Sequence, residues 1–101
     1  MSAHTPGPWK AEGPDNFGDW IIVPVAAKLA VAAVVHNLRP DKEEAANAHL
    51  IVAAPDLLAA LKRQQDNIRR WLATGVPATE EESKEISDQI DAAIAKAEGR
   101  Q

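Results

Sequence analysis

The stretch RPDKEE, residues 39–44, divides the chain into two parts of different composition. Most of the glycine and proline lies before it, and long uninterrupted helical patterns follow it. Asp41 is the predicted N-cap of the first helix, because Glu44 takes the capping-box position and the neighbouring acids suit the positive end of a helix. The sequence therefore predicts an α+β fold, with a sheet in residues 1–40 and helices in residues 41–101.

Three segments of the first part have the composition of strands. Trp9–Glu12 lies between clusters of glycine and proline, and residues 19–23 are rich in aromatic and β-branched types. Pro24 lacks an amide donor, which places this end at an edge or in a turn. Residues 29–35 alternate like a strand, although their alanines also suit a helix. Because they are apolar on both faces, they are predicted to form the central strand of a short three-stranded antiparallel β-meander.

The second part begins with a helix that must kink. It runs from residue 41 to Pro55, where the missing amide donor kinks or restarts it. The helical pattern then continues to the turn at Gly75. Its apolar residues form one stripe at spacings of mostly three, four and seven, namely Leu57, Leu58, Leu61, Ile68, Trp71 and Leu72.

The C-terminal helix begins at Thr79, and its capping-box partner is Glu82. Its narrow apolar stripe needs a partner helix, and the short link of residues 75–78 favours an antiparallel helical hairpin with the preceding helix. That stripe consists of Ile86, Ile90, Ala93, Ile94 and Ala97. At 101 residues, the whole chain is predicted to be a single domain.

The composition limits the core and several classes of function. Twenty residues are alanine, so the predicted core is thin, and Trp9, Trp20 and Trp71 carry unusual weight in it. The absence of cysteine excludes disulfides and thiolate chemistry. The net charge of −4 disfavours a nucleic-acid partner. We expect no membrane association and a cytoplasmic location, because neither a signal sequence nor a span of about 20 apolar residues is present.

Residues that carry chemistry are few and form no motif. His4, His36 and His49 have no second metal ligand at a diagnostic spacing, so each is predicted to be structural, and no metal or cofactor is expected. Ser83 and Ser87 lie on a polar helix without a nucleophile elbow. No glycine-rich loop is present to hold a phosphate group. We therefore expect a protein that is not an enzyme.

Two charged surfaces are candidates for binding a partner. The basic stretch that ends at Trp71 suits an acidic protein or a nucleic acid. The acidic last helix could instead imitate a phosphate backbone. The simpler alternative is that the two sets of charges neutralise each other across the hairpin. The predicted partner-binding residues are Lys62, Arg63, Arg69, Arg70, Trp71, Glu81 and Glu85.

Two motifs resemble a group of small proteins encoded by tailed bacteriophages and prophages. They are HTPGPW at residues 4–9 and ANAHLIVAAPDLL at residues 46–58, with the strand of residues 19–22 between them. The resemblance covers about the first two thirds of the chain, and the acidic last helix lies outside it. It implies an accessory phage product that works inside a bacterial host by binding host machinery, as inhibitors of CRISPR and other defence systems do.

Two residues of these motifs have predicted structural roles. Asn47 is expected to hydrogen-bond a sheet carbonyl across the interface between helix and sheet, and Trp9 is expected to lie pinned under the helices.

The leading hypothesis is a non-enzymatic protein that inhibits a host system, such as CRISPR or another defence system, by occupying a host protein or protein complex. We also expect a homodimer, because the thin sheet and narrow helix stripes would bury more surface in one. The alternative is a ligand-sequestering protein that captures a small nucleotide signal. Its anchors would be Lys62, Arg69 and Arg70 around Trp71 or Trp20.

Overall fold

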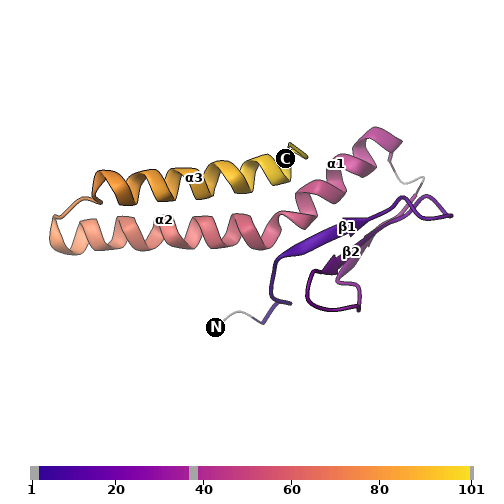
Figure 1. Cartoon of the computed structure of the whole chain (residues 1–101), viewed down its shortest axis with the longest axis horizontal. Coiled ribbons are helices and arrows are strands. Elements are labelled where there is room, and N and C mark those ends of the chain that lie inside the picture. Colours follow the sequence, from indigo (N-terminus) through magenta and orange to yellow (C-terminus); the bar gives the residue numbers. More distant parts are fainter. Residues whose placement is uncertain (1–2, 37–38, 101) are drawn as a thin grey trace.

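The computed structural model describes residues 3–36 and 39–100 of the chain. Within these residues lie the strands β1 (Trp9–Glu12), β2 (Trp20–Pro24) and β3 (Ala32–Val34), and the helices α1 (Asp41–Val52), α2 (Ala54–Thr74) and α3 (Glu80–Ala97). The strands form an antiparallel sheet that α1 covers, and α2 and α3 extend away from it as a hairpin (Figure 1). The predicted α+β fold, with the sheet before the helices, is confirmed.

The central strand is β2, and the prediction that residues 29–35 would be central is wrong. The sheet order is β1-β2-β3, with Trp9 opposite Pro24 and Trp20 opposite Val34. The third strand is short and lies at the edge, because its alanines bring little apolar surface to bury. The larger side chains of β2 supply more of it, and Ile22 is fully buried.

The core lies between the sheet and α1. Ile22, Ala48 and Val52 form its buried centre, and Trp9 and Trp20 are among the side chains that pack against it. Alanine at position 48 lets the helix approach the sheet closely, since no larger side chain stands between them. The predicted place of Trp9 under a helix is confirmed. The expectation that all three tryptophans serve the core is wrong, because Trp71 is 52% exposed.

The predicted helix break is confirmed at Ala53, between α1 and α2. The Ala53 amide donates to the His49 carbonyl at 3.1 Å, and the Ala53 carbonyl accepts from the Leu57 amide at 2.8 Å. Pro55 stands in the first turn of α2, where its missing amide donor costs nothing. The break lets α1 lie on the sheet while α2 runs outward.

The start of α1 differs from the prediction. Pro40 is the N-cap residue, Asp41 is the first helical residue, and no side chain caps the helix. The predicted capping box is absent because the Glu44 carboxylate is directed toward the His36 ring instead, at 3.4 Å. The predicted end of α2 is confirmed, since Gly75 adopts a left-handed conformation with φ 72° and its amide donates to the Trp71 carbonyl at 2.7 Å.

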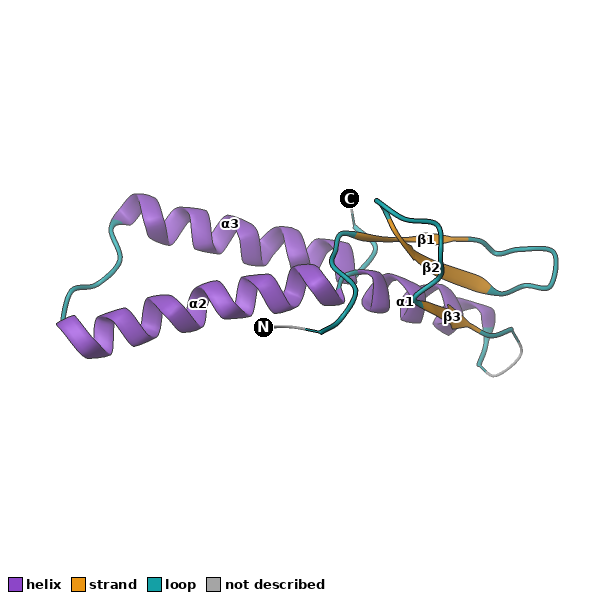
Figure 2. Cartoon of the chain, turned by 90° about the horizontal axis from the view of Figure 1, so that it is seen from below, coloured by secondary structure: helices purple, strands orange, loops and turns teal. Residues whose placement is uncertain are grey.

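The helical hairpin and its capping box are confirmed. Thr79 accepts a hydrogen bond from the Glu82 amide at 3.1 Å, and the Thr79 amide donates to the Glu82 carboxylate at 3.3 Å. Figure 2 shows α2 and α3 side by side over their length and the sheet at one end.

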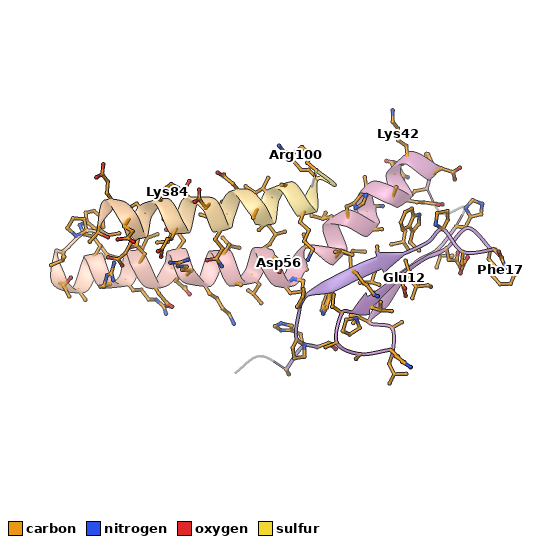
Figure 3. All side chains as sticks on the ribbon, viewed as in Figure 1. Glu12, Phe17, Lys42, Asp56, Lys84 and Arg100 are labelled. Atoms are coloured by element: carbon orange, nitrogen blue, oxygen red, sulfur yellow. The ribbon has the colours of Figure 1, made fainter. Side chains whose placement is uncertain are left out.

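The projecting hairpin makes the molecule long and rich in exposed surface. Its dimensions are 55 × 27 × 20 Å, and its radius of gyration is 16.6 Å, against about 13 Å for a compact chain of this length. The accessible surface is 7245 Å², whereas a compact monomer of this mass exposes about 5,600 Å². Figure 3 shows side chains directed outward along both hairpin helices. Much of the hairpin therefore lacks a packing partner within the chain.

Two alanine substitutions test where the core ends. Ile22→Ala should lower the free energy of unfolding by about 2–5 kcal/mol, because it leaves a cavity at a fully buried site. Leu72→Ala should change it by less than about 0.5 kcal/mol, because Leu72 is 73% exposed. Urea denaturation followed by circular dichroism measures both. Equal losses in the two variants would show that Leu72 is packed.

Candidate protein-binding surface

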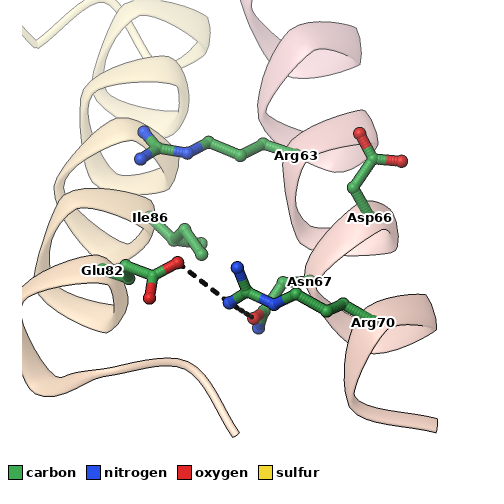
Figure 4. Close-up of a pocket in the computed structure, with 6 residues that line it drawn as sticks. All are labelled: Arg63, Asp66, Asn67, Arg70, Glu82 and Ile86. Carbon is green, nitrogen blue, oxygen red and sulfur yellow. Dashed lines mark hydrogen bonds and ion pairs between the residues drawn. The ribbon is translucent and has the colours of Figure 1, made fainter. Parts of the chain in front are cut away.

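The contact between α2 and α3 combines a few buried apolar side chains, Ala60, Ile86 and Ala93, with ion pairs and hydrogen bonds at its edges. Arg63 pairs with Glu85 at 2.8 Å and donates to the Gln89 side chain at 2.9 Å. Arg70 pairs with Glu82 at 2.9 Å, and Figure 4 shows this pair bridging the two helices. At the other end of the hairpin, Lys96 of α3 pairs with Asp56 of α2 at 2.7 Å. The simpler alternative is thus confirmed for Arg63, Arg70 and Glu85, which neutralise charges across the hairpin.

These contacts shift the ionisation of Glu82. The hydrogen bond from Arg70, followed by that from the Thr79 amide, holds the pKa of the Glu82 carboxyl below its usual value. On α3, the hydrogen bond to Asp88 raises the pKa of Lys84. Both pairs are exposed to solvent and contribute little to the stability of the fold; Arg70–Glu82 joins α2 to α3, whereas Lys84–Asp88 lies within α3.

Most of the apolar stripe of α2 does not face α3. At 100° per residue, Leu61, Ile68 and Leu72 lie within about 40° of one another around the helix axis. Ala60 and Arg63, on the side of α3, lie about 100° or more away from Leu61. The prediction of one stripe at helical spacing is right, but most of the stripe is turned to solvent. The exposed members are Leu58 at 37%, Leu61 at 68%, Ile68 at 44%, Trp71 at 52% and Leu72 at 73%.

Basic residues border this outer face of α2, by which we mean Leu58, Leu61, Gln65, Ile68 and Leu72. A shallow hollow of about 600 Å³ lies on it, with Lys62 and Arg69 at its edge. Arg69 makes no hydrogen bond or ion pair with the residues that the structure describes. The face is therefore apolar along its centre and positive along one side.

The predicted partner-binding residues thus fall into separate groups. Lys62 and Arg69 border the outer face, and Trp71 lies exposed near the end of α2. Arg63, Arg70 and Glu85 are engaged between the helices. Glu81 is an exposed acid in the first turn of α3. The structure does not bring the seven residues together as one surface.

Sequence reasoning missed the apolar residues of the outer face as binding candidates. The signal that could have identified them is the position of the arginines. Arg63 and Arg70 lie seven residues apart, and so do Glu82 and Gln89, which receive their hydrogen bonds. When arginines repeat along one helix and their hydrogen-bond acceptors repeat at the same spacing along the next, the two rows identify the sides of the helices that face each other. The apolar stripe on the other side of α2 then has to face outward.

Other predicted contacts are not formed. Asn47 is exposed, lies beside a hollow next to β3, and makes no hydrogen bond to a described residue, so its predicted bond to the sheet is wrong. The proposed nucleotide anchors do not converge, because Arg70 is directed toward α3, Arg69 lies on the outer side of α2, and Trp20 packs beside His49 in α1.

Comparison with known proteins identifies a phage family. The chain matches, over residues 1–101, the model of the family described as Salmonella phage P22 protein Y8K6. It belongs to this family. The Y8K6 match includes the acidic last helix, so the expectation that this helix lies outside the resemblance is wrong. No curated protein and no solved structure matched the chain. Among the described helices of this Y8K6 family member, none is long and apolar enough to cross a membrane.

The Arg70–Glu82 pair gives a prediction of pH dependence. Because the folded-state pKa of Glu82 lies below its unfolded value, its contribution is present above the unfolded pKa and is lost as the pH falls toward the folded pKa. Glu82→Gln should therefore flatten the decline in unfolding free energy between about pH 5 and about pH 3. Urea titrations at several pH values measure it. Glu80→Gln, in the same turn, is the control, and an unchanged slope in Glu82→Gln would refute the role of the pair.

Proposed function

We propose that this phage protein is a non-enzymatic binding protein that inhibits a host system by occupying a host protein, and that the outer face of α2 is its binding surface. The observation that supports this proposal is an apolar stripe left uncovered along a helix that projects from the body of the fold. Contiguous apolar side chains that stay exposed and are bordered by polar residues are typical of protein interaction sites.

The elongated shape leaves apolar side chains of α2 accessible to a partner. The chain exposes roughly 1,600 Å² more than a compact chain of its mass, and Leu61 and Leu72 are among the side chains that contribute to this exposed surface. The side chains of the outer face can also supply the binding energy, because burying one leucine or isoleucine side chain contributes about 1.5–3 kcal/mol. A few such anchors at the centre of an interface carry most of its binding energy.

The pattern of the outer face defines the chemistry of its partner. Leu58, Leu61, Gln65, Ile68 and Leu72 recur at alternating spacings of three and four, which is the seam pattern of paired helices. Lys62 and Arg69 flank that seam on one side. The matching surface is an amphipathic helix or helical groove whose apolar centre is bordered by acidic residues.

A second copy of the chain fits this face poorly. In an antiparallel pair of α2 helices, Lys62 of one copy would lie against Arg69 of the other, and like charges repel. In a parallel pair, the flanking residues opposite them would be Leu57 and Gln64, which carry no charge. Neither arrangement places an acidic side chain opposite Arg69, so the homodimer expected from the sequence is not part of the proposal.

The proposed effect on the host is inhibition of a defence system. The support is the membership in a phage family, together with a chain whose sequence contains no catalytic motif. A small protein of this kind can block a larger one by covering the surface through which that protein meets its own substrate or partner. CRISPR interference is the first system to test, followed by other bacterial defences.

Plaque formation on bacteria with an active defence system tests this proposal. Expression of the chain should raise the efficiency of plaquing of a phage that the system restricts, and the chain should co-purify with one component of that system. Leu61→Glu should lose both effects, because loss of a central anchor costs about 2 kcal/mol or more, a roughly 30-fold loss of affinity. Arg69→Glu should lose both effects because it places an acidic side chain opposite the acidic border of the partner, where like charges repel.

Matched changes away from the outer face are the controls. Val76→Glu places the same charge on an exposed apolar residue in the turn, and Lys28→Glu reverses a cation in the loop after β2; both should remain active. If Glu81→Lys alone abolishes the effect, the acidic helix is the binding surface and the proposal is wrong. If the wild-type chain protects phage from none of the systems, inhibition of defence is refuted.

A further inference from the structure

We propose that His36, Asp41 and Glu44 form a binding site for one divalent transition-metal ion, with Zn²⁺ as the ion that fits best. The His36 Nδ1 atom lies 3.4 Å from a Glu44 carboxylate oxygen and 3.9 Å from an Asp41 carboxylate oxygen. One ligand atom from each residue lies within 4.8 Å of the other two. Ligand atoms on a tetrahedral zinc ion stand about 3.4 Å apart, so small adjustments bring all three onto one ion.

The buried carboxylate is the least ordinary feature of this cluster. Glu44 is 3% exposed, and no other ionisable side chain among the described residues is buried. Burial of a carboxylate is costly unless opposite charge or hydrogen bonds offset it. The start of α1 and the His36 ring are among the groups that stabilise the Glu44 carboxylate. A divalent cation would add to them, since His36 is neutral when it acts as a metal ligand and the two carboxylates then supply the negative charge that the ion requires.

The position of the His36 imidazole is fixed by a hydrogen bond from the backbone of His36. The His36 amide donates to the Asp19 carboxylate at 2.7 Å, and the Asp19 amide donates to the Asp15 carboxylate at 2.9 Å. Gly18 gives the ring its space, because a Cβ atom there would lie 2.6 Å from the His36 ring. The two carboxylates come from the first turn of α1, so the site is built on a helix and on a braced segment rather than on one loop.

The surroundings leave room for a further ligand. A hollow of about 240 Å³ lies at the cluster and is lined in part by His36, Asp41, Glu44 and Trp20. Asp41 has a side chain that is 89% exposed, which gives an ion direct access from solvent. Three protein ligands with an open fourth position for water is a coordination that zinc accepts. The imidazole in the donor set favours zinc, cobalt or nickel over magnesium and calcium, which prefer oxygen ligands alone.

The bound ion would connect the segment after β3 to the first turn of α1. Because the ligands are brought together only by the fold, the ion binds the folded chain in preference to the unfolded one and stabilises it. The site lies at the sheet end of the molecule, away from the hairpin, so its test is independent of the function proposed for α2.

Calorimetric titration of the untagged, chelator-treated chain with Zn²⁺ tests the site, with Co²⁺ as a spectroscopic probe. One ion should bind per chain, the melting temperature should rise with zinc concentration, and Co²⁺ should give visible absorption bands. Asp41→Asn should lower the zinc affinity more than roughly tenfold, which is the loss expected when a residue that only supports a metal ligand is removed. The variant should keep its fold, because the Asp41 side chain is exposed. His36→Gln should abolish binding.

Glu43→Gln is the matched control. It removes the same charge from the same helical turn, but Glu43 pairs with Arg39 at 3.0 Å and lies outside the cluster. It should keep wild-type affinity. The proposal is overturned if the wild-type chain binds neither ion, if Asp41→Asn and Glu43→Gln bind as tightly as each other, or if His49→Gln removes the binding that His36→Gln leaves.

Discussion

The break between α1 and α2 is the constraint on which the rest of the structure depends. Pro55 cannot continue the hydrogen-bond ladder of α1, and Ala53 closes one helix while it opens the next. The N-terminal arm packs against this break, because a Cβ atom on Gly7 would lie 2.6 Å from the Pro55 side chain. Two motifs that are distant in the sequence, HTPGPW and ANAHLIVAAPDLL, therefore meet at the point where the chain leaves the sheet.

The break separates two kinds of packing. Before it, α1 buries Ala48 and Val52 against Ile22 and forms the core with the sheet. After it, α2 leaves the sheet and meets α3 through ion pairs and the buried side chains of Ala60, Ile86 and Ala93. Its larger apolar side chains, among them Leu61 and Leu72, remain largely exposed. A straight helix could not serve both purposes. The surface that we propose for a host protein is thus a direct consequence of the geometry that builds the core.

Local features of the fold could be predicted from the sequence because their causes are local. Pro55 breaks a helix, Thr79 and Glu82 cap one, and Gly75 ends one, wherever the rest of the chain lies. The order of the strands was harder to predict. Residues 29–35 are apolar on both faces, which is typical of a central strand, and only the small size of their side chains indicates that the strand lies at an edge. Asp41 failed as a cap because its supposed partner Glu44 has a closer partner in His36, eight residues earlier.

The candidate sites depended on contacts between distant segments, and these were predicted in part. The charges of Lys62 and Arg69 could be read from the sequence, but their apolar neighbours were not among the predicted partner-binding residues, because a helical stripe shows its spacing and not the direction in which it points. The cluster of His36, Asp41 and Glu44 has no recognisable spacing motif, since its residues come from two segments, one after β3 and one in the first turn of α1. Stripes of charge on α2 and α3 were the one sequence feature that could have fixed the orientation.

The central claim is that the outer face of α2 stays uncovered in the isolated chain. Small-angle X-ray scattering on the column-purified protein measures mass and shape together. The account predicts a monomer whose radius of gyration is close to the 16.6 Å of the backbone and well above the roughly 13 Å of a compact chain. A compact monomer would mean that the hairpin folds back on the sheet, and a dimer would mean that a second copy covers the face; either result would contradict the account.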